Sequence, residues 1–303
     1  MQKDNKRLVV VVGPTAVGKT SLCIKLAQLF NTDIVSADSR QFYKELNIGT
    51  AKPSIEEMQG LKHHFINSHS VKEEYDVGKY EADALALLEK LFKEKDIIIL
   101  TGGSGLYIKA VCEGFDEMPE VKEGLREELN RQYAENGLEP LVKELEELDP
   151  DYAAEVDVDN PQRVIRALEV IKSAGKPYSS FRKQSKKVRP FDILKIGLVR
   201  EREELYERID RRMDEMLSQG LLKEATALYE YKNKYALQTV GYQELFDFID
   251  NKYDYSEAVR LLKRNSRRYA KRQLTWFKKD KEIKWFHPHE EDELINYIKI
   301  NQL

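Results

Sequence analysis

The sequence predicts an α/β fold in which a parallel β-sheet is wound with helices and carries an inserted all-helical domain. Short β-branched stretches alternate with helical patterns in the N-terminal third of the chain. This alternation is typical of a parallel sheet with crossover helices. A charged, amphipathic stretch follows from residue 120 to about residue 187, and the strand-like stretch 191–199 then indicates that the chain returns to the sheet.

The individual elements follow from their residue patterns. Buried parallel strands are expected in four short apolar runs, at 8–12, 33–38, 95–101 and 191–199. Helices are expected where apolar residues recur at helical spacing, at 21–30, at 77–93, through most of 120–187, and from 199 to about 279. We therefore expect a catalytic core at 1–119 and 190–303, ending in basic helices, and a helical insertion domain at 120–189.

Composition limits the class of protein. The chain has 303 residues, of which 34% are charged, and a mean hydropathy of −0.60. We find no apolar stretch near the roughly 18 residues of a membrane span. We expect no signal peptide, because residues 1–7 lead directly into the first predicted strand. We expect a cytoplasmic protein that does not bind membranes, with Cys23 and Cys112 as reduced thiols. The net charge of −3 does not by itself indicate a nucleic-acid partner.

The first predicted strand is followed by a phosphate-binding loop. The segment fits G-x-x-x-x-G-K-[ST] at every specified position and consists of Gly13, Pro14, Thr15, Ala16, Val17, Gly18, Lys19 and Thr20. In such a loop the backbone N–H groups and the helix N-terminus attract anions, Lys19 reaches the terminal phosphates, and the Thr20 hydroxyl can ligate Mg²⁺. The loop predicts a P-loop NTPase-like sheet that binds a phosphate ester or pyrophosphate. It does not distinguish hydrolysis, phosphoryl transfer and displacement of pyrophosphate from carbon.

Polar residues at the ends of later strands are further candidates, because ligands of open α/β sheets bind at the carboxyl ends of strands. Asp38 ends the second predicted strand. It could hold Mg²⁺, cap a turn, or accept a proton from a bound nucleophile. Ser104 follows the third strand in a glycine-rich turn, and Lys52 offers a cation near the same edge.

The order and identity of seven segments resemble the tRNA dimethylallyltransferase (isopentenyl-tRNA transferase) family. They are GPTAVGKT at 13–20, DSRQFYKELNIGTAKP at 38–53, TGGSGLY at 101–107, NPQRVIRALEV at 160–170, RIDRRMDEM at 208–216, VGY at 240–242 and RRYAKRQLTWF at 267–277. The resemblance implies transfer of a dimethylallyl group from dimethylallyl pyrophosphate to the exocyclic N6 amine of the adenosine 3′-adjacent to the anticodon in tRNA, with release of pyrophosphate. The implied partners are dimethylallyl pyrophosphate and the tRNA anticodon stem-loop, and we expect a monomer.

The resemblance also assigns catalytic roles. Asp38 would be the general base on the amine, Arg212 would contact the pyrophosphate, and Ser104 stands where the family usually has threonine. An allylic pyrophosphate ionises partly in the transition state, so Lys19, the loop amides and Mg²⁺ would neutralise the leaving group.

A basic segment supports RNA binding independently. Residues 260–279 contain nine lysines and arginines and no acidic residue. On a helix, a basic face at Arg260, Arg264, Arg267 and Lys271 would be backed by an apolar anchor at Leu262, Tyr269, Trp276 and Phe277. Together with the resemblance, this predicts a tRNA-binding set of Asp38, Ser39, Arg40, Gln41, Arg126, Gln162, Arg163, Val164, Ile165, Arg166, Gln238, Thr239, Val240, Gly241, Tyr242, Gln243, Lys271 and Arg272. The target base would have to leave its stack to be modified.

The histidines do not indicate a metal site. His63, His64 and His69 have a spacing that fits no standard zinc pattern. His287 and His289 lie in a polar tail with no discernible partners.

Other functions stay open on the residues alone. A small-molecule kinase could use the same loop, with Asp38 binding an acceptor hydroxyl. A prenyltransferase acting on free adenine nucleotides is a second alternative. Neither requires the basic helix or the helical insertion. A nucleotide-dependent RNA-binding protein without catalysis would leave Asp38 and Ser104 unexplained.

Overall fold

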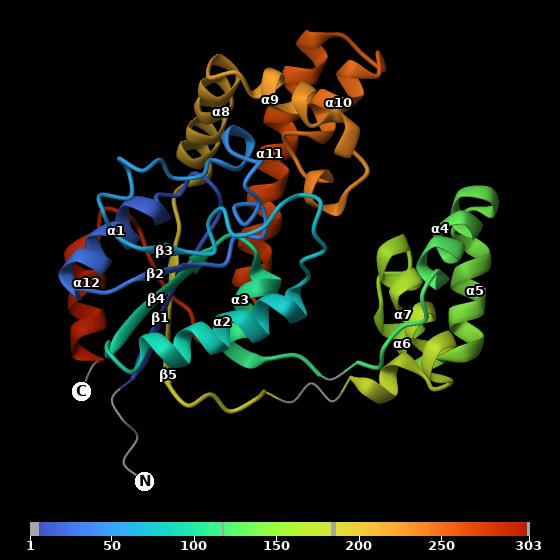
Figure 1. The fold of residues 1–303 in the computed structure, drawn as a ribbon, viewed down its shortest axis with the longest axis horizontal. Helices are drawn as coiled ribbons and strands as arrows, with labels where there is room; N and C mark the ends of the chain where they lie inside the picture. The colour runs from blue at the N-terminus through green and yellow to red at the C-terminus, as the bar shows by residue number, and fades with distance from the viewer. Residues whose placement is uncertain (1–5, 117, 183–185, 302–303) are drawn as a thin grey trace. The chain divides into compact units, whose positions relative to one another are not determined.

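A computed structural model describes residues 6–116, 118–182 and 186–301 (Figure 1). The chain forms two compact units. One consists of Met1–Cys112 and Val188–Leu303, and the other of Glu113–Lys187. These bounds differ by a few residues from those expected at 119/120 and 189/190.

The first unit contains a parallel sheet that is six-stranded in the described part of the chain, with strand order β3-β2-β4-β1-β5-β6. The strands are β1 Arg7–Val12, β2 Ile34–Ser36, β3 His63–His64, β4 Ile97–Gly102, β5 Asp192–Leu198 and β6 Lys284–Phe286. The predicted α/β class is confirmed, and the four expected strands are present. Sequence reasoning missed β3 and β6, because edge strands of two or three residues leave no apolar run to detect.

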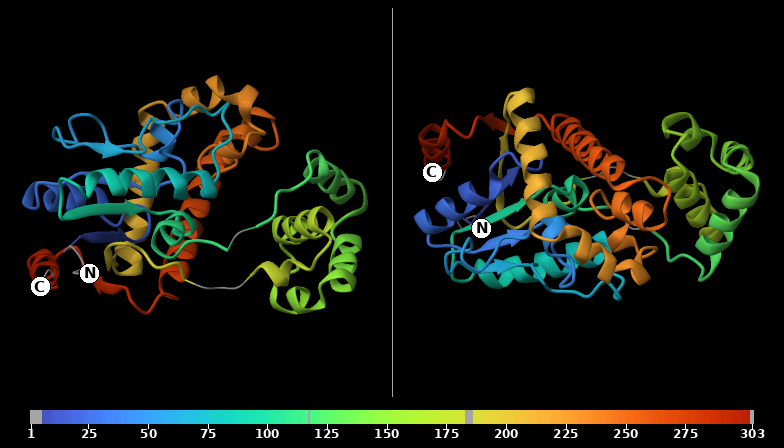
Figure 2. Two further views of the ribbon diagram at one scale, coloured as in Figure 1. Left: turned by 60° about the horizontal axis from the view of Figure 1, so that its bottom comes forward. Right: turned by 90° about the horizontal axis from the view of Figure 1, so that it is seen from above.

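Helices cover both faces of this sheet (Figure 2). They are α1 Lys19–Leu29, α2 Val77–Leu91, α3 Gly105–Glu113, α8 Arg202–Ser218, α9 Leu221–Ala227, α10 Gln243–Ile249, α11 Tyr255–Phe277 and α12 Glu291–Ile300, with short 3₁₀ turns η1 Ile48–Thr50, η3 Tyr229–Tyr231 and η4 Tyr235–Leu237. The helix α12 was not expected. It lies beside α1, to which an ion pair between Lys25 and Glu291 at 2.7 Å joins it.

The central strand β1 is buried on both faces. Leu8 and Val10 pack into the core beneath α2, α10 and α11, whereas Val9 and Val11 pack into the core beneath α1 and α12. Alternate residues of a strand point to opposite faces, so a strand covered on both sides must be apolar throughout. This is the physical reason for the uninterrupted valine run.

The second unit is all-helical. It contains α4 Leu125–Asn136, α5 Glu139–Leu148, α6 Pro150–Glu155, α7 Pro161–Ala174 and η2 Tyr178–Phe181, which share one apolar core. Buried Asp149 caps α6 through the Tyr152 N–H at 3.1 Å and accepts a hydrogen bond from the Ser179 N–H at 2.7 Å. One carboxylate thus joins two turns of this unit.

Two further features bear on the expectations from sequence. Within the described ranges, none of the helices combines the length and apolar character needed to cross a membrane. Cys23 and Cys112 are both buried.

Candidate active site

The phosphate-binding loop lies between β1 and α1, and Lys19 begins the helix. Gly18 has a φ of 114° and Gly13 a φ of 148°, and a Cβ on Gly13 would lie 2.7 Å from the Leu198 carbonyl oxygen. Both positions therefore favour glycine. The ammonium of Lys19 donates to the carbonyl oxygens of Gly13 and Pro14 at 2.8 Å each. Burial lowers the pKa of Lys19 to about 8, so the loop encloses a cation that an entering anion would stabilise.

Arginines on and beside α8 contact successive residues of this loop. Arg212 donates to the Thr15 hydroxyl at 3.3 Å and to the Ala51 carbonyl at 3.4 Å. Arg208 donates to the Ala16 carbonyl at 2.8 Å, and Arg200 donates to the Val17 carbonyl at 2.9 Å. Burial lowers the pKa of Arg212, and the charge of Asp38 partly offsets this effect. The structure thus brings three arginines to the loop that carries Lys19.

Of these arginines, only Arg212 was predicted from the sequence. Arg208 stands four residues before Arg212, so the two project from the same face of α8. This four-residue spacing could have identified Arg208 as a second arginine near the loop. Arg200 precedes α8, and helix periodicity could not have identified it.

Asp38 follows β2 at the edge of the sheet. Its Oδ1 atom accepts a hydrogen bond from the Arg40 N–H at 3.1 Å, so this carboxylate caps its own turn. The charge of Asp38 also raises the pKa of Lys19 against burial and adds to the burial that raises the pKa of Tyr269 to about 12. Asp38 therefore caps its own turn and also interacts electrostatically with Lys19 of the phosphate-binding loop.

Ser104 is joined to the same turn. Its Oγ atom accepts a hydrogen bond from the Ser39 N–H at 3.0 Å and lies 3.0 Å from the Ser39 Oγ atom. This contact ties the end of β4 to the turn that carries Asp38.

Gln273 of α11 is a site residue that sequence reasoning missed. Its side chain is 6% exposed, accepts a hydrogen bond from the Thr15 N–H at 2.9 Å and donates to the Gly103 carbonyl at 2.9 Å. Gly103 lies close to this side chain, because a Cβ there would lie 2.3 Å from the Gln273 Nε2 atom and would displace it. The only signal was its place beside Lys271 and Arg272 in a segment assigned to RNA.

A cavity of about 710 Å³ joins the phosphate-binding loop to the turn after β2. The predicted site residues among its lining are Thr15, Ala16, Val17, Gly18, Lys19, Thr20, Asp38, Arg40, Gln41, Arg212, Thr239, Val240 and Gly241. Residues predicted to bind pyrophosphate and some of those predicted to bind tRNA therefore share one cavity.

Other predicted tRNA-binding residues belong to the helical unit. Gln162 and Arg163 are exposed on the first turn of α7, whereas Arg126 and Arg166 pair with Glu169 at 3.2 Å and 2.9 Å. The remaining residues from this unit are Val164 and Ile165.

Three members of the predicted tRNA-binding set are buried. Val164 and Ile165 are 0% and 1% exposed in the core of the helical unit. Tyr242 is 0% exposed, and its hydroxyl donates to Glu224 at 2.6 Å. These three side chains pack against the protein interior, so their part in RNA binding stays a prediction. These residues were predicted because they lie within segments that resemble the family. Such a resemblance does not indicate which side chains are buried.

The basic face of α11 also differs from the expectation. Arg260 pairs with Glu257 at 2.6 Å, and Arg267 pairs with Asp210 at 2.5 Å. Intramolecular ion pairs thus occupy part of this face, while Lys271 and Arg272 are exposed. Of the expected anchor, Leu262 and Phe277 are buried, but Trp276 is 41% exposed. It packs over Gly105, where a Cβ would lie 2.2 Å from the indole.

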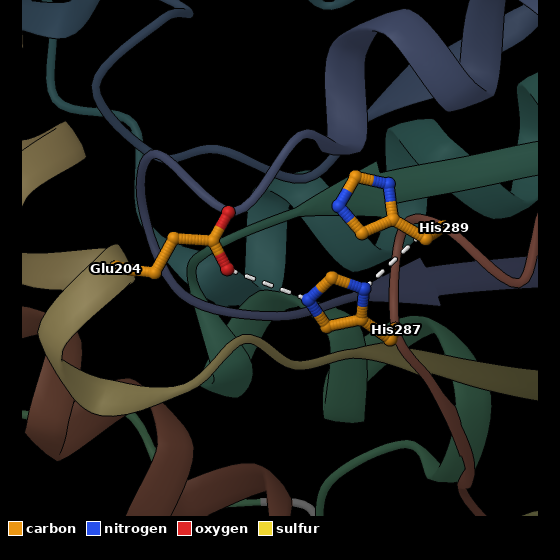
Figure 3. Close-up of side chains that lie close together, drawn as sticks. All are labelled: Glu204, His287 and His289. Atoms are coloured by element: carbon orange, nitrogen blue, oxygen red, sulfur yellow. Dashed lines mark hydrogen bonds and ion pairs between the residues drawn. The ribbon is translucent and has the colours of Figure 1, made fainter.

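The view that His287 has no partner is wrong. His287 Nε2 lies 3.4 Å from a carboxylate oxygen of Glu204, and its Nδ1 accepts a hydrogen bond from the His289 N–H at 3.2 Å (Figure 3). Glu204 also forms an ion pair with Arg200. Because the carboxylate is already shared between a guanidinium and an imidazole, we assign this cluster to fastening the turn after β6 to the first turn of α8.

Comparisons with known proteins agree with this geometry. Residues 41–280 match the family model described as IPP transferase. The tRNA dimethylallyltransferase of Cytophaga hutchinsonii is 55% identical over 295 residues, which are 97% of each chain. The crystal structure of a tRNA isopentenylpyrophosphate transferase from Bacillus halodurans superposes with a TM-score of 0.73 at 38% identity and covers 98% of this chain and 97% of that one. A eukaryotic dimethylallyltransferase captured acting on tRNA gives a TM-score of 0.75 at 28% identity, covering 93% of this chain and 74% of the other. The family that the seven sequence segments predicted is confirmed, and the chain belongs to the IPP transferase family.

Proposed function

We propose that this chain is a tRNA dimethylallyltransferase. It transfers the dimethylallyl group of dimethylallyl pyrophosphate to the N6 amine of the adenosine 3′-adjacent to the anticodon and releases pyrophosphate. The single observation that carries the proposal is the shared cavity, in which the phosphate-binding loop, Arg212 and Asp38 meet. Such a cavity offers cations for the leaving group and a carboxylate for the nucleophile.

The cations would act on the donor. As the bond between C1 and the pyrophosphate oxygen breaks, its electron pair leaves with pyrophosphate, and Lys19, Arg212 and the loop N–H groups stabilise the added charge. Their hydrogen bonds to loop atoms already hold Lys19 and Arg212 in place. Little reorganisation is therefore needed when the charge develops.

Mg²⁺ is the cofactor that this site fits. The Thr20 hydroxyl is exposed on the first turn of α1, and both Thr20 and Asp38 line the cavity. Hydroxyl and carboxylate oxygens are ligands that Mg²⁺ accepts together with pyrophosphate oxygens and water. When bound, the ion would supply further charge neutralisation to the pyrophosphate.

Asp38 would act on the acceptor. The N6 lone pair forms the new bond to C1, and the proton that N6 loses passes to the Asp38 carboxylate. The hydrogen bond from the Arg40 N–H fixes the orientation of that carboxylate. Ser39 and Ser104 hold the surrounding turn.

The RNA would be bound by residues that line the cavity and by exposed polar residues on two helices. Thr239, Val240 and Gly241 line the cavity beside Arg40 and Gln41. Lys271 and Arg272 on α11, and Gln162 and Arg163 on α7, are exposed and free to contact phosphate or base edges. We propose that the protein acts as a monomer, in the cytoplasm where its tRNA substrate would be found.

The test is mass spectrometry of an unmodified anticodon stem-loop with an adenosine 3′ of the anticodon, incubated with protein, Mg²⁺ and dimethylallyl pyrophosphate. AMP and ATP serve as parallel acceptors. We expect one prenyl mass gain on the RNA and none on the nucleotides. A gain on AMP alone would assign the chain to free-nucleotide prenyl transfer. No gain on any acceptor would favour the alternative of a small-molecule kinase.

A further inference from the structure

One carboxylate of α9 gathers hydrogen bonds from two different loops. The Oε2 atom of Glu224 accepts from the N–H groups of Asn47 and Ile48 at 3.2 Å and 2.9 Å. Its Oε1 atom accepts from the Gly49 N–H at 3.0 Å and from the Tyr242 hydroxyl at 2.6 Å. Hydrogen bonds to a charged acceptor are about twice as strong as neutral ones. Glu224 is thus the meeting point of these two loops.

The first loop borders the part of the cavity that would bind the donor. Gly49, Thr50 and Ala51 line the cavity. The Ala51 carbonyl accepts a hydrogen bond from Arg212 at 3.4 Å, and the Thr50 carbonyl accepts one from Gln41 at 3.2 Å. A shift of this loop would therefore move partners of the pyrophosphate-binding arginine.

The second loop borders the part that would bind RNA. Thr239, Val240 and Gly241 line the cavity, and buried Tyr242 follows them directly. The two loops are in close contact, because a Cβ on Gly49 would lie 2.6 Å from the Tyr242 ring and a Cβ on Gly241 would lie 3.8 Å from the Gly49 carbonyl oxygen. Burial and the charge of Glu224 both raise the pKa of Tyr242, so the phenol keeps its proton and remains a donor.

We propose that Glu224 is a positioning residue that sets the spacing of the loops at 47–51 and 239–242, and that both the prenyl donor and the RNA bind tightly only when it does so. The inference rests on the proposed function. Without the carboxylate, consecutive backbone N–H groups and the Tyr242 hydroxyl would have no common acceptor, and donors left unsatisfied in this way favour a rearrangement of the loops. Glu224 itself does not line the cavity, so its effect on the substrates passes through the loops.

The decisive variant is Glu224→Gln, which preserves size but removes the charge and one acceptor oxygen. Its matched control is Glu230→Gln, which removes an exposed carboxylate from the neighbouring turn η3. We expect the KM for dimethylallyl pyrophosphate and the KM for the anticodon stem-loop each to rise by about 10-fold in Glu224→Gln, with a change in Tm of no more than about 4 °C and no change in the control. A fall in Tm with both KM values unchanged would overturn the proposal, because Glu224 would then only support the fold.

A second variant tests whether Glu224 and Tyr242 act together. Tyr242→Phe keeps the ring against Gly49 and removes only the hydroxyl that donates to Glu224. We expect both KM values to rise by about 3-fold in Tyr242→Phe, and the double variant to match Glu224→Gln alone, because residues of one network are not additive. KM values in the double variant equal to the product of the single effects would show that the two residues act independently.

Equilibrium binding separates this inference from the proposed function. Dissociation constants for inorganic pyrophosphate with Mg²⁺, and separately for the stem-loop, require no turnover. If the wild-type chain transfers no prenyl group, the proposed function fails, while the contrast between Glu224→Gln and Glu230→Gln still decides whether Glu224 positions the two loops. Equal dissociation constants in both variants would overturn the positioning role.

Discussion

The amide oxygen of Gln273 accepts a hydrogen bond from the Thr15 N–H at 2.9 Å across 258 positions of sequence. The same amide donates to the Gly103 carbonyl. A helix near the end of the chain thereby holds the phosphate-binding loop against the end of β4.

Replacing Gln273 with alanine should weaken donor binding. The Thr15 N–H and the Gly103 carbonyl would lose their partner, and leaving a buried polar group unpaired costs about 1–3 kcal/mol. We expect the dissociation constant for dimethylallyl pyrophosphate, measured by calorimetry, to rise by about 10-fold. Gln132→Ala removes a half-buried glutamine of α4 in the helical unit, and this control should leave donor binding unchanged. An unaltered affinity in Gln273→Ala would show that the loop keeps its shape without this hydrogen bond.

Asp38→Asn should abolish most turnover and spare RNA binding. Asparagine keeps the oxygen that caps the Arg40 N–H but is a very weak base, so single-turnover prenyl transfer should fall by roughly 10²–10⁴-fold. Stem-loop affinity, measured by fluorescence anisotropy, should stay within a few-fold. The exposed Asp292 of α12 provides the control, Asp292→Asn. Near-normal turnover in Asp38→Asn would remove Asp38 from the proton transfer.

Arg212→Ala should slow the chemical step as well as weaken donor binding. Arg212 donates to Thr15 and lines the cavity, and removal of a preorganised charge from a developing anion costs about 10²–10³ in kcat. Steady-state kinetics with the stem-loop as acceptor would give kcat and the KM for dimethylallyl pyrophosphate. The comparison variant is Arg202→Ala, at an exposed position in the first turn of α8. A rise in KM alone would assign Arg212 to ground-state binding.

Donor binding should weaken as the pH rises through the pKa of Lys19, which burial lowers to about 8. Below that pH Lys19 is charged and attracts the pyrophosphate; above it the attraction is lost. Calorimetric titrations of dimethylallyl pyrophosphate without RNA, from pH 7 to pH 9.5, would reveal the decline. Lys19→Arg, which stays protonated throughout this range, should remove it, and a persistent decline in that variant would attribute the titration to another group.

The same lowered pKa affects stability with a defined sign. Since the pKa of Lys19 is below its unfolded value of 10.5, the unfolded chain binds more protons between the two values. The destabilisation from Lys19 is therefore fully present below pH 8 and is relieved as the pH rises from about 8 towards 10.5. Urea unfolding of the wild type should show a smaller loss of stability over this interval than that of Lys19→Met, in which this contribution is absent. A larger loss of stability in the wild type than in Lys19→Met would contradict the lowered pKa of Lys19.

Charge reversal at Lys271 and Arg272 should weaken stem-loop binding and reduce its salt dependence. Both side chains are exposed on α11. For each RNA phosphate that the protein no longer neutralises, the slope of log K against log salt should fall in magnitude by about 0.7 to 0.9. Lys299→Glu changes an exposed lysine on α12 and should leave the slope unaltered. Equal slopes in all variants would place the RNA elsewhere.

The parts of the site that sequence reasoning found are those encoded locally. The phosphate-binding loop depends on glycines at 13 and 18 and on a lysine that begins the next helix, all within eight residues. Strands β1, β2, β4 and β5 were likewise predictable, because burial on both faces of a sheet favours a run of apolar residues, and each of these strands lies in such a run. The short edge strands β3 and β6 depend on pairing with a neighbour, which no local pattern records.

What the sequence by itself determined was therefore the fold class, the phosphate-binding loop and, through seven ordered segments, the family. Only the tertiary structure decided which distant groups complete the site: Gln273 at Thr15, Arg208 and Arg200 on the loop carbonyls, and Glu224 between two loops. It also decided that Val164, Ile165 and Tyr242 are buried while Trp276 is exposed. The physical reason is that turn and helix geometry arises from neighbours in the chain, whereas burial and long-range hydrogen bonds arise only when separate elements pack against one another.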